Sequence, residues 1–214
     1  MRNTQRAIFA LVMLLAMRGS VFAQSGWFVE GRVLADNDRT LVMRSATTLG
    51  GGAAVGVLLT RAVSVRSEFD IPAWHVDETV YRASTVFGPT EIINQHTAAR
   101  TLTWSFLVAR HTKTLGRFQA ALLAGFALTS RPWTESSRLD TLDAGGGIAF
   151  SRFAKWSSDH WWFAIPVGVD VSVQVARRLA IVPQLRIYVY PFPTDTPAQT
   201  ILRPAITLRW TFGQ

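Results

Sequence analysis

Between Phe163 and Val175 the sequence alternates without a break between two kinds of side chain. The odd positions hold only phenylalanine, isoleucine or valine, whereas the even positions hold alanine, proline, glycine, aspartate, serine or glutamine. Successive side chains of a β-strand point to opposite faces, so this period of two predicts a strand. The run is roughly twice the ordinary strand length of about five to six residues. It therefore predicts an unusually long strand with one wholly apolar face.

The same alternation returns twice before the chain ends, over residues 181–189 and 202–212. One face of each segment is apolar, and the other mixes charged with small residues. A barrel that spans a membrane needs this arrangement, because lipid surrounds it, its interior is polar and no strand edge stays open. The pattern predicts an all-β fold built as a transmembrane β-barrel.

Weaker alternation marks further strands in the first part of the chain. With the three segments above, they make about eight strands and predict a single up-and-down antiparallel barrel. The additional segments are residues 27–35, 49–59, 63–73, 102–108 and 118–128.

The connections between these strands alternate between long and short. Outer-membrane barrels have short periplasmic turns and long outer loops, so this alternation places both chain ends in the periplasm. The sequence leaves the role of the longest loop open, although Ile148-Ala149-Phe150 could extend a hairpin above the membrane. The predicted loops are 36–44, 75–100 and 131–160, and the predicted turns are 60–61, 111–116 and 176–178.

The first 23 residues have the pattern of a secretory signal peptide. Arg2 and Arg6 precede an apolar run from Ala7 to Met17, and Val21-Phe22-Ala23 suits cleavage after Ala23. This divides the chain into a signal peptide, 1–23, and an outer-membrane barrel domain, 24–214. No later run reaches the roughly 18 apolar residues that a membrane helix needs, although the mean hydropathy is +0.19.

Composition narrows the possible partners. The chain has no cysteine, which excludes a disulfide scaffold and thiol catalysis. Its net charge is +8, but the basic residues are scattered through alternating strands and form no basic helix or arginine-rich tail. This distribution favours contact with anionic lipid headgroups and lipopolysaccharide, and no nucleic-acid partner is expected.

Aromatic residues gather near the predicted strand ends, as expected of the girdles at the two membrane interfaces. The periplasmic girdle would hold Trp27, Phe118, Trp210 and Phe212, and the outer girdle Trp133, Trp161, Phe163 and Phe192.

Four prolines count against the strand predictions, because each removes a hydrogen bond between strands. All four are expected near strand ends. They are Pro72, Pro166, Pro183 and Pro204.

On these features residues 24–214 resemble the small outer-membrane β-barrel proteins of Gram-negative bacteria, of the OmpA and OmpX type. Trp210-Thr211-Phe212 resembles the terminal aromatic signal of such barrels, although Gly213 and Gln214 follow it. The resemblance implies export to the cell outer membrane, recognition by the barrel assembly machinery through the C-terminal aromatic strand, and a monomer.

Charged residues on the inward faces of the strands are the candidate functional site. An eight-stranded barrel is just wide enough for side chains to fill, and buried charges must be paired. Two interpretations stay open: a salt-bridged network that fills the lumen, or a narrow pore for ions or small solutes. Gly50, Gly52 and Gly56 would leave room for arginines opposite. The inward charges are Glu30, Arg32, Arg66, Glu68, Asp70, Asp170, Arg186, Arg203 and Arg209.

No residue pattern indicates an enzyme, a metal site or a cofactor. The four histidines lack metal-ligand spacing. Ser158-Asp159-His160 contains the residue types of a catalytic triad, but adjacent residues cannot converge as a triad must. Outer-membrane lipid A deacylases use a His-x-Ser pair, which this sequence lacks. We expect a structural or surface-binding role through the outer loops, with a lipid A-modifying enzyme and a soluble lipocalin-like barrel as less favoured alternatives.

Overall fold

The computed structural model describes residues 26–38, 46–84, 90–143, 145–191 and 200–213. The predicted signal peptide and Phe192 lie outside this range. No helix in the described part of the chain is long and apolar enough to cross a membrane. The strands are β1 (Trp27–Asp38), β2 (Ala46–Leu58), β3 (Val63–Pro72), β4 (His75–Ser84), β5 (Thr90–Ala99), β6 (Leu102–His111), β7 (Phe118–Leu142), β8 (Ile148–Ala176), β9 (Leu179–Val189) and β10 (Thr200–Phe212).

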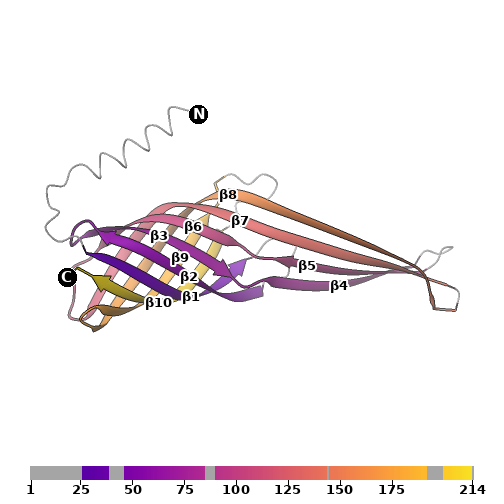
Figure 1. Cartoon of the computed structure of the whole chain (residues 1–214), viewed down its shortest axis with the longest axis horizontal. Helices are drawn as coiled ribbons and strands as arrows, with labels where there is room; N and C mark the ends of the chain where they lie inside the picture. The colour runs from indigo at the N-terminus through magenta and orange to yellow at the C-terminus, as the bar shows by residue number, and fades with distance from the viewer. Residues whose placement is uncertain (1–25, 39–45, 85–89, 144, 192–199, 214) are drawn as a thin grey trace, which may run out of the picture.

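Eight of these strands close into an antiparallel ring (Figure 1). The order around the ring is β1-β2-β3-β6-β7-β8-β9-β10, and β10 returns to β1 with Trp27 opposite Phe212. Consecutive ring strands are neighbours throughout, except that β4 and β5 are inserted in the chain between β3 and β6. The predicted all-β, up-and-down barrel is therefore confirmed.

Burial follows the alternation of the sequence. In β9 the side chains of Val182, Gln184 and Arg186 are buried in the lumen, whereas Ile181 and Leu185 are each 40% exposed on the outside. The apolar face of each ring strand thus points away from the barrel axis. A soluble lipocalin-like barrel has the opposite arrangement, with its apolar face inward.

Three short turns join ring strands at the end of the barrel where β1 begins and β10 ends. They span residues 59–62, 112–117 and 177–178, close to the turns predicted from the sequence. In the first turn the Thr60 hydroxyl accepts hydrogen bonds from the backbone amides of Ala62 and Val63 at 3.1 and 3.0 Å. In the second, Gly116 adopts a positive φ of 62°, which favours glycine.

At the opposite end, two predicted loops are wrong. Within 75–100, residues 75–84 and 90–99 form the antiparallel pair β4–β5, and the described residues of 131–160 are mostly the continuation of β7 and β8. Together these segments make a four-stranded sheet, β4-β5-β7-β8, that extends beyond the ring (Figure 1). We call this sheet the blade, and it consists of residues 75–84, 90–99, 131–142 and 148–162. The predicted hairpin extension at residues 148–150 is part of it. The predicted loop 36–44 also starts too early, because β1 continues to Asp38.

The prolines interrupt the ring without breaking it. Pairing of β7 with β8 skips Pro166, which pairs instead with Tyr188 of β9. Pairing of β1 with β10 likewise skips Pro204, which pairs with Leu185 of β9. In an antiparallel sheet, the backbone of each residue forms hydrogen bonds with only one of the two neighbouring strands. Proline, which has no backbone N–H, therefore interrupts the pairing on one side only. The expectation that all four prolines lie near strand ends is wrong for Pro166, because β8 continues from the ring into the blade.

Candidate functional site

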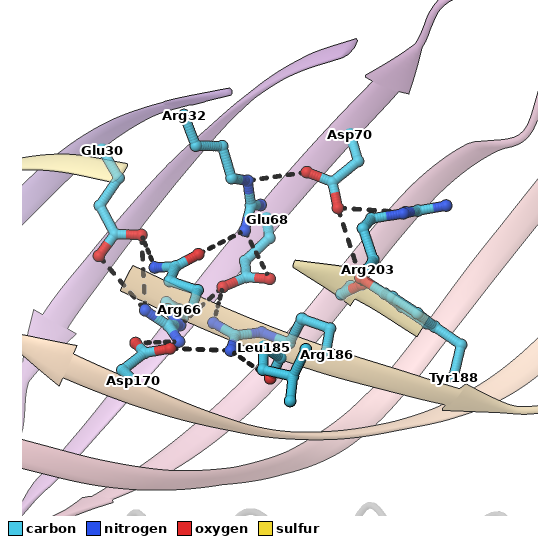
Figure 2. Close-up of polar contacts among 12 residues, drawn as sticks. Glu30, Arg32, Arg66, Glu68, Asp70, Asp170, Leu185, Arg186, Tyr188 and Arg203 are labelled. Atoms are coloured by element: carbon cyan, nitrogen blue, oxygen red, sulfur yellow. Dashed lines mark hydrogen bonds and ion pairs between the residues drawn. The ribbon is translucent and has the colours of Figure 1, made fainter. Parts of the chain in front are cut away.

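All nine side chains predicted to point inward are buried in the lumen. Figure 2 shows how all of them except Arg209 meet one another there, and Arg209 pairs with Glu30 and Asp170. They come from five strands, of which β3 supplies three, β1 and β10 supply two each, and β8 and β9 supply one each. These strands are far apart in the sequence, so closure of the ring brings the charges together. The nine are Glu30, Arg32, Arg66, Glu68, Asp70, Asp170, Arg186, Arg203 and Arg209.

Glu68 lies at the centre of this network. Its carboxylate is 2.9 Å from Nη1 of Arg32, 2.9 Å from Nε of Arg66 and 3.1 Å from Nη2 of Arg186. The side chain of Glu68 is completely buried, and those of the three arginines are at most 2% exposed. A buried carboxylate needs such partners, since burial of an unpaired charge is very costly.

Asp170 and Glu30 complete the network on the side of the short turns. Asp170 lies 2.7 Å from Nη2 of Arg66, 2.8 Å from Nη1 of Arg186 and 3.4 Å from Nη2 of Arg209. Glu30 pairs with Nε of Arg209 at 2.6 Å and with Nη1 of Arg66 at 3.3 Å. Arg66 and Arg209 therefore each bridge these two acids, which come from strands far apart in the sequence.

Toward the blade, the network continues through Asp70. Its carboxylate lies 2.7 Å from Nε of Arg32 and 3.2 Å from Nη1 of Arg203, and it accepts a 3.4 Å hydrogen bond from the Tyr188 hydroxyl. Arg203 also pairs with Asp36 at 3.2 Å. Asp36 is not among the residues predicted from the sequence, because the alternation of the first strand is weak and the predicted loop begins at this residue.

Ten charged side chains thus form one connected network in the lumen. Every arginine of the network contacts at least two carboxylates, and the five arginines balance the five acids, Asp36 included. Gln184 joins it as a neutral member, since its amide accepts from Arg32 and donates to Glu30, both at 3.3 Å. The arrangement can neutralise and fill the barrel interior.

Small residues make room for this network, as predicted, but not at every glycine. A Cβ on Gly52 would collide with Oδ1 of Asp70 and lie 2.8 Å from Nε of Arg32, so the Arg32–Asp70 pair crosses β2 at this glycine. At Gly56 the space is taken by the ring of Phe28. At Gly50 it is taken by the backbone of β3. Gly52 therefore leaves room for an arginine, as expected, whereas Gly50 and Gly56 leave room for other groups.

The residues of the apparent triad do not converge. The Ser158 hydroxyl lies 3.0 Å from Nδ1 of His160, but Asp159 points to the other face of β8 and accepts a 2.7 Å hydrogen bond from Ser130. Among the described residues, no three histidine, aspartate or glutamate side chains are grouped so that they could hold a metal ion.

Solved structures resemble this chain, although no protein-family model and no curated protein matches it. The N-terminal β-barrel domain of Pseudomonas aeruginosa OprF gives a TM-score of 0.51 at 11% identity, over 88% of this chain and 98% of that domain. The chain has the fold of the small outer-membrane β-barrels. A major outer membrane protein from Thermus thermophilus matches with a TM-score of 0.48 at 12% identity, over 88% of this chain and 99% of that one. Ail of Yersinia pestis, in complex with the heparin analogue sucrose octasulfate, matches with a TM-score of 0.46 at 8% identity, over 88% and 99% of the two chains.

Exposed aromatic residues at the strand ends suit an outer-membrane barrel. Near the short turns Trp27 stacks on Phe212 with ring centroids 4.0 Å apart, and Phe118 is 56% exposed. Where the blade joins the ring, Trp161 and Phe163 are 66% and 42% exposed. These positions agree with aromatic girdles at the two membrane interfaces.

Proposed function

We propose that the protein is an integral outer-membrane barrel whose lumen is closed by its own ion pairs, and that it acts through its surface rather than by transport. One observation carries this proposal: the five arginines and five carboxylates of the network pair with one another across the barrel interior. A solute entering the lumen would have to displace these pairs and leave buried charges without partners.

The alternative is a narrow pore for ions or small solutes. It would need a water-filled path past Glu68, whose carboxylate already contacts three guanidinium groups. Liposome swelling with small sugars separates the two functions. Liposomes that contain the wild-type protein should swell no faster than empty liposomes, and fast swelling would show that solutes pass.

The blade is the part best suited to a binding role at the cell surface. Val80 of β4 is 66% exposed, and Phe153 and Trp156 of β8 are 68% and 53% exposed, on a sheet that extends beyond the ring. Exposed apolar side chains outside a membrane favour contact with other molecules. A variant in which a short turn replaces residues 76–98 should still insert into the outer membrane. It should no longer bind the molecules that the whole protein binds at the cell surface.

We expect no enzymatic activity. Ser158 and His160 are hydrogen-bonded, but Asp159 does not orient the histidine, since it accepts a hydrogen bond from Ser130 instead. Mass spectra of lipid A from cells with and without the protein should be identical. A changed acyl pattern that disappears with His160→Ala would contradict this expectation.

The expected partners are lipid and lipopolysaccharide around the barrel and the assembly machinery during insertion, with the mature protein a monomer. The exposed apolar face of the ring, with residues such as Val33 at 62% and Ile206 at 65%, supports a lipid environment. Export through residues 1–23 would deliver the chain to the outer membrane. After carbonate washing, the protein should stay in the outer-membrane fraction, and recovery from the soluble periplasm would contradict a membrane location.

A further inference from the structure

A polar pocket lies at the end of the barrel that carries the short turns. Its volume is about 590 Å³, and it is lined by residues of the 59–62 and 112–117 turns and of β8. This volume falls within the range of about 300–1,000 Å³ that is typical of small-molecule sites. The lumen network lies deeper in the barrel, so the pocket is a separate feature of the molecule.

The described residues that line this pocket are rich in hydrogen-bond donors, and none of them has an acidic side chain. The lining residues include Arg61 and Arg117, which carry guanidinium groups, and Thr60, Thr114 and Ser172, which carry hydroxyls. Another lining residue is a histidine, His111, whose Nε2 lies 2.8 Å from the hydroxyl of the neighbouring strand's Ser64. Guanidinium groups beside hydroxyls suit phosphate, because charge-assisted hydrogen bonds to its oxygens are strong.

The turns around the pocket strengthen this preference. They carry five basic residues and no acidic one, so the three turns together are strongly positive. Charge of one sign around a concave site raises the local concentration of oppositely charged solutes. The five are Arg61, Lys113, Arg117, Arg177 and Arg178.

The direction of the lining side chains favours a dissolved ligand over a lipid headgroup. Gln119 of β7 and Ser172 and Gln174 of β8 line the pocket, and they share the inward alternation of Ala121 and Asp170 on the same strands. The pocket therefore belongs to the mouth of the lumen, not to the outer surface that faces lipid. A headgroup would have to leave the bilayer surface to enter it.

We propose that this mouth binds a small solute that carries two or more phosphate groups, with Arg61 and Arg117 as the main contacts. The site would lie on the periplasmic side of an outer-membrane barrel. This inference does not require the lumen to be closed, because the ligand needs to reach only the mouth. It assigns a binding role to the end of the molecule opposite the blade.

Calorimetric titration of tripolyphosphate into the purified barrel, in a zwitterionic detergent at low ionic strength, tests the site. We expect saturable binding of one tripolyphosphate per chain. The double variant Arg61→Ser/Arg117→Ser should bind at least about tenfold more weakly, because it removes both guanidinium groups from the pocket. Absence of saturable binding to the wild type would overturn the proposal.

The matched control is Arg177→Ser/Arg178→Ser, which removes the same charge from the same end but no residue that lines the pocket. Its affinity should stay within about threefold of the wild type, since only long-range attraction is lost. Equal weakening in the two double variants would mean diffuse attraction and would contradict a pocket. Thermal unfolding of both variants in detergent checks that each is folded.

A second titration separates the two sources of phosphate. In nanodiscs, tripolyphosphate should bind equally well whether the lipid is phosphatidylcholine alone or contains phosphatidylglycerol. Competition by phosphatidylglycerol that disappears in Arg61→Ser/Arg117→Ser would show that the mouth takes lipid headgroups, which would overturn the assignment of a dissolved ligand.

Discussion

At the scale of single residues, Glu68 and Gly52 show how the lumen accommodates so many charges. Glu68 contacts Arg32, Arg66 and Arg186, so one carboxylate holds three guanidinium groups in place. Gly52 allows Arg32 to reach the carboxylate of β3 across β2, because a Cβ there would occupy the same space. Neither role follows from residue type alone, since both depend on which strands become neighbours in the ring.

Removing the charge of Glu68 should destabilise the barrel without creating or abolishing a reaction. Glu68→Gln leaves three buried guanidinium groups with too little negative charge, and loss of a partner from a buried ion pair typically costs about 3–5 kcal/mol. The melting temperature in detergent should fall clearly. Glu78→Gln is the matched control, because the Glu78 side chain is 77% exposed in the blade. Equal melting temperatures for the two variants would contradict a central role for Glu68.

Gly52→Ala tests whether the network needs the space beside β2. The added Cβ would lie 2.8 Å from Nε of Arg32 and collide with Asp70, so we expect a loss of about 1–3 kcal/mol, as for other overpacked interiors. Chemical unfolding of the two proteins in lipid vesicles measures the difference. Gly51→Ala, whose Cβ would have only a backbone oxygen 3.8 Å away, should be nearly neutral. A stability change as large as that of Gly52→Ala would count against the steric explanation.

At the scale of strands, the sequence predicts the strands of the ring well. It predicts the strands of the blade poorly. Lipid outside and polar groups inside force the side chains of β8 and β9 to alternate, so their inward residues can be recognised without the fold. The blade extends beyond the ring, so β4 and β5 are not required to present an apolar face to lipid, and their sequence predicts a loop. Asp36 escapes prediction for a related reason, because it lies near the end of β1, where the alternation fades.

Trypsin added to intact cells should cut the blade and spare the ring. The blade offers sites at Arg82, Arg138 and Arg152, whereas Lys113 and Arg177 lie in turns at the opposite end. Mass spectrometry of the fragments should find cleavage at the turns only after the outer membrane has been permeabilised. Early cleavage at Lys113 in intact cells would mean that the barrel has the reverse orientation.

At the scale of the whole molecule, ring closure turns separate charged strands into one network. Arg186 of β9 reaches Glu68 of β3, and Arg209 of β10 reaches Asp170 of β8, across the interior. The alternation in the sequence predicts that these side chains share the lumen. It could not predict the individual pairs, because those depend on the register and order of eight strands.

Conductance across a planar lipid bilayer tests most directly whether the ion pairs close the barrel. With the wild-type protein inserted, we expect no steady current steps above the baseline of the bilayer, because in our proposal the network fills the lumen. Arg186→Ala, which removes one guanidinium from the interior, should allow small and irregular leaks. Steady, ion-selective channels formed by the wild-type protein would contradict a closed lumen and would identify the barrel as a pore.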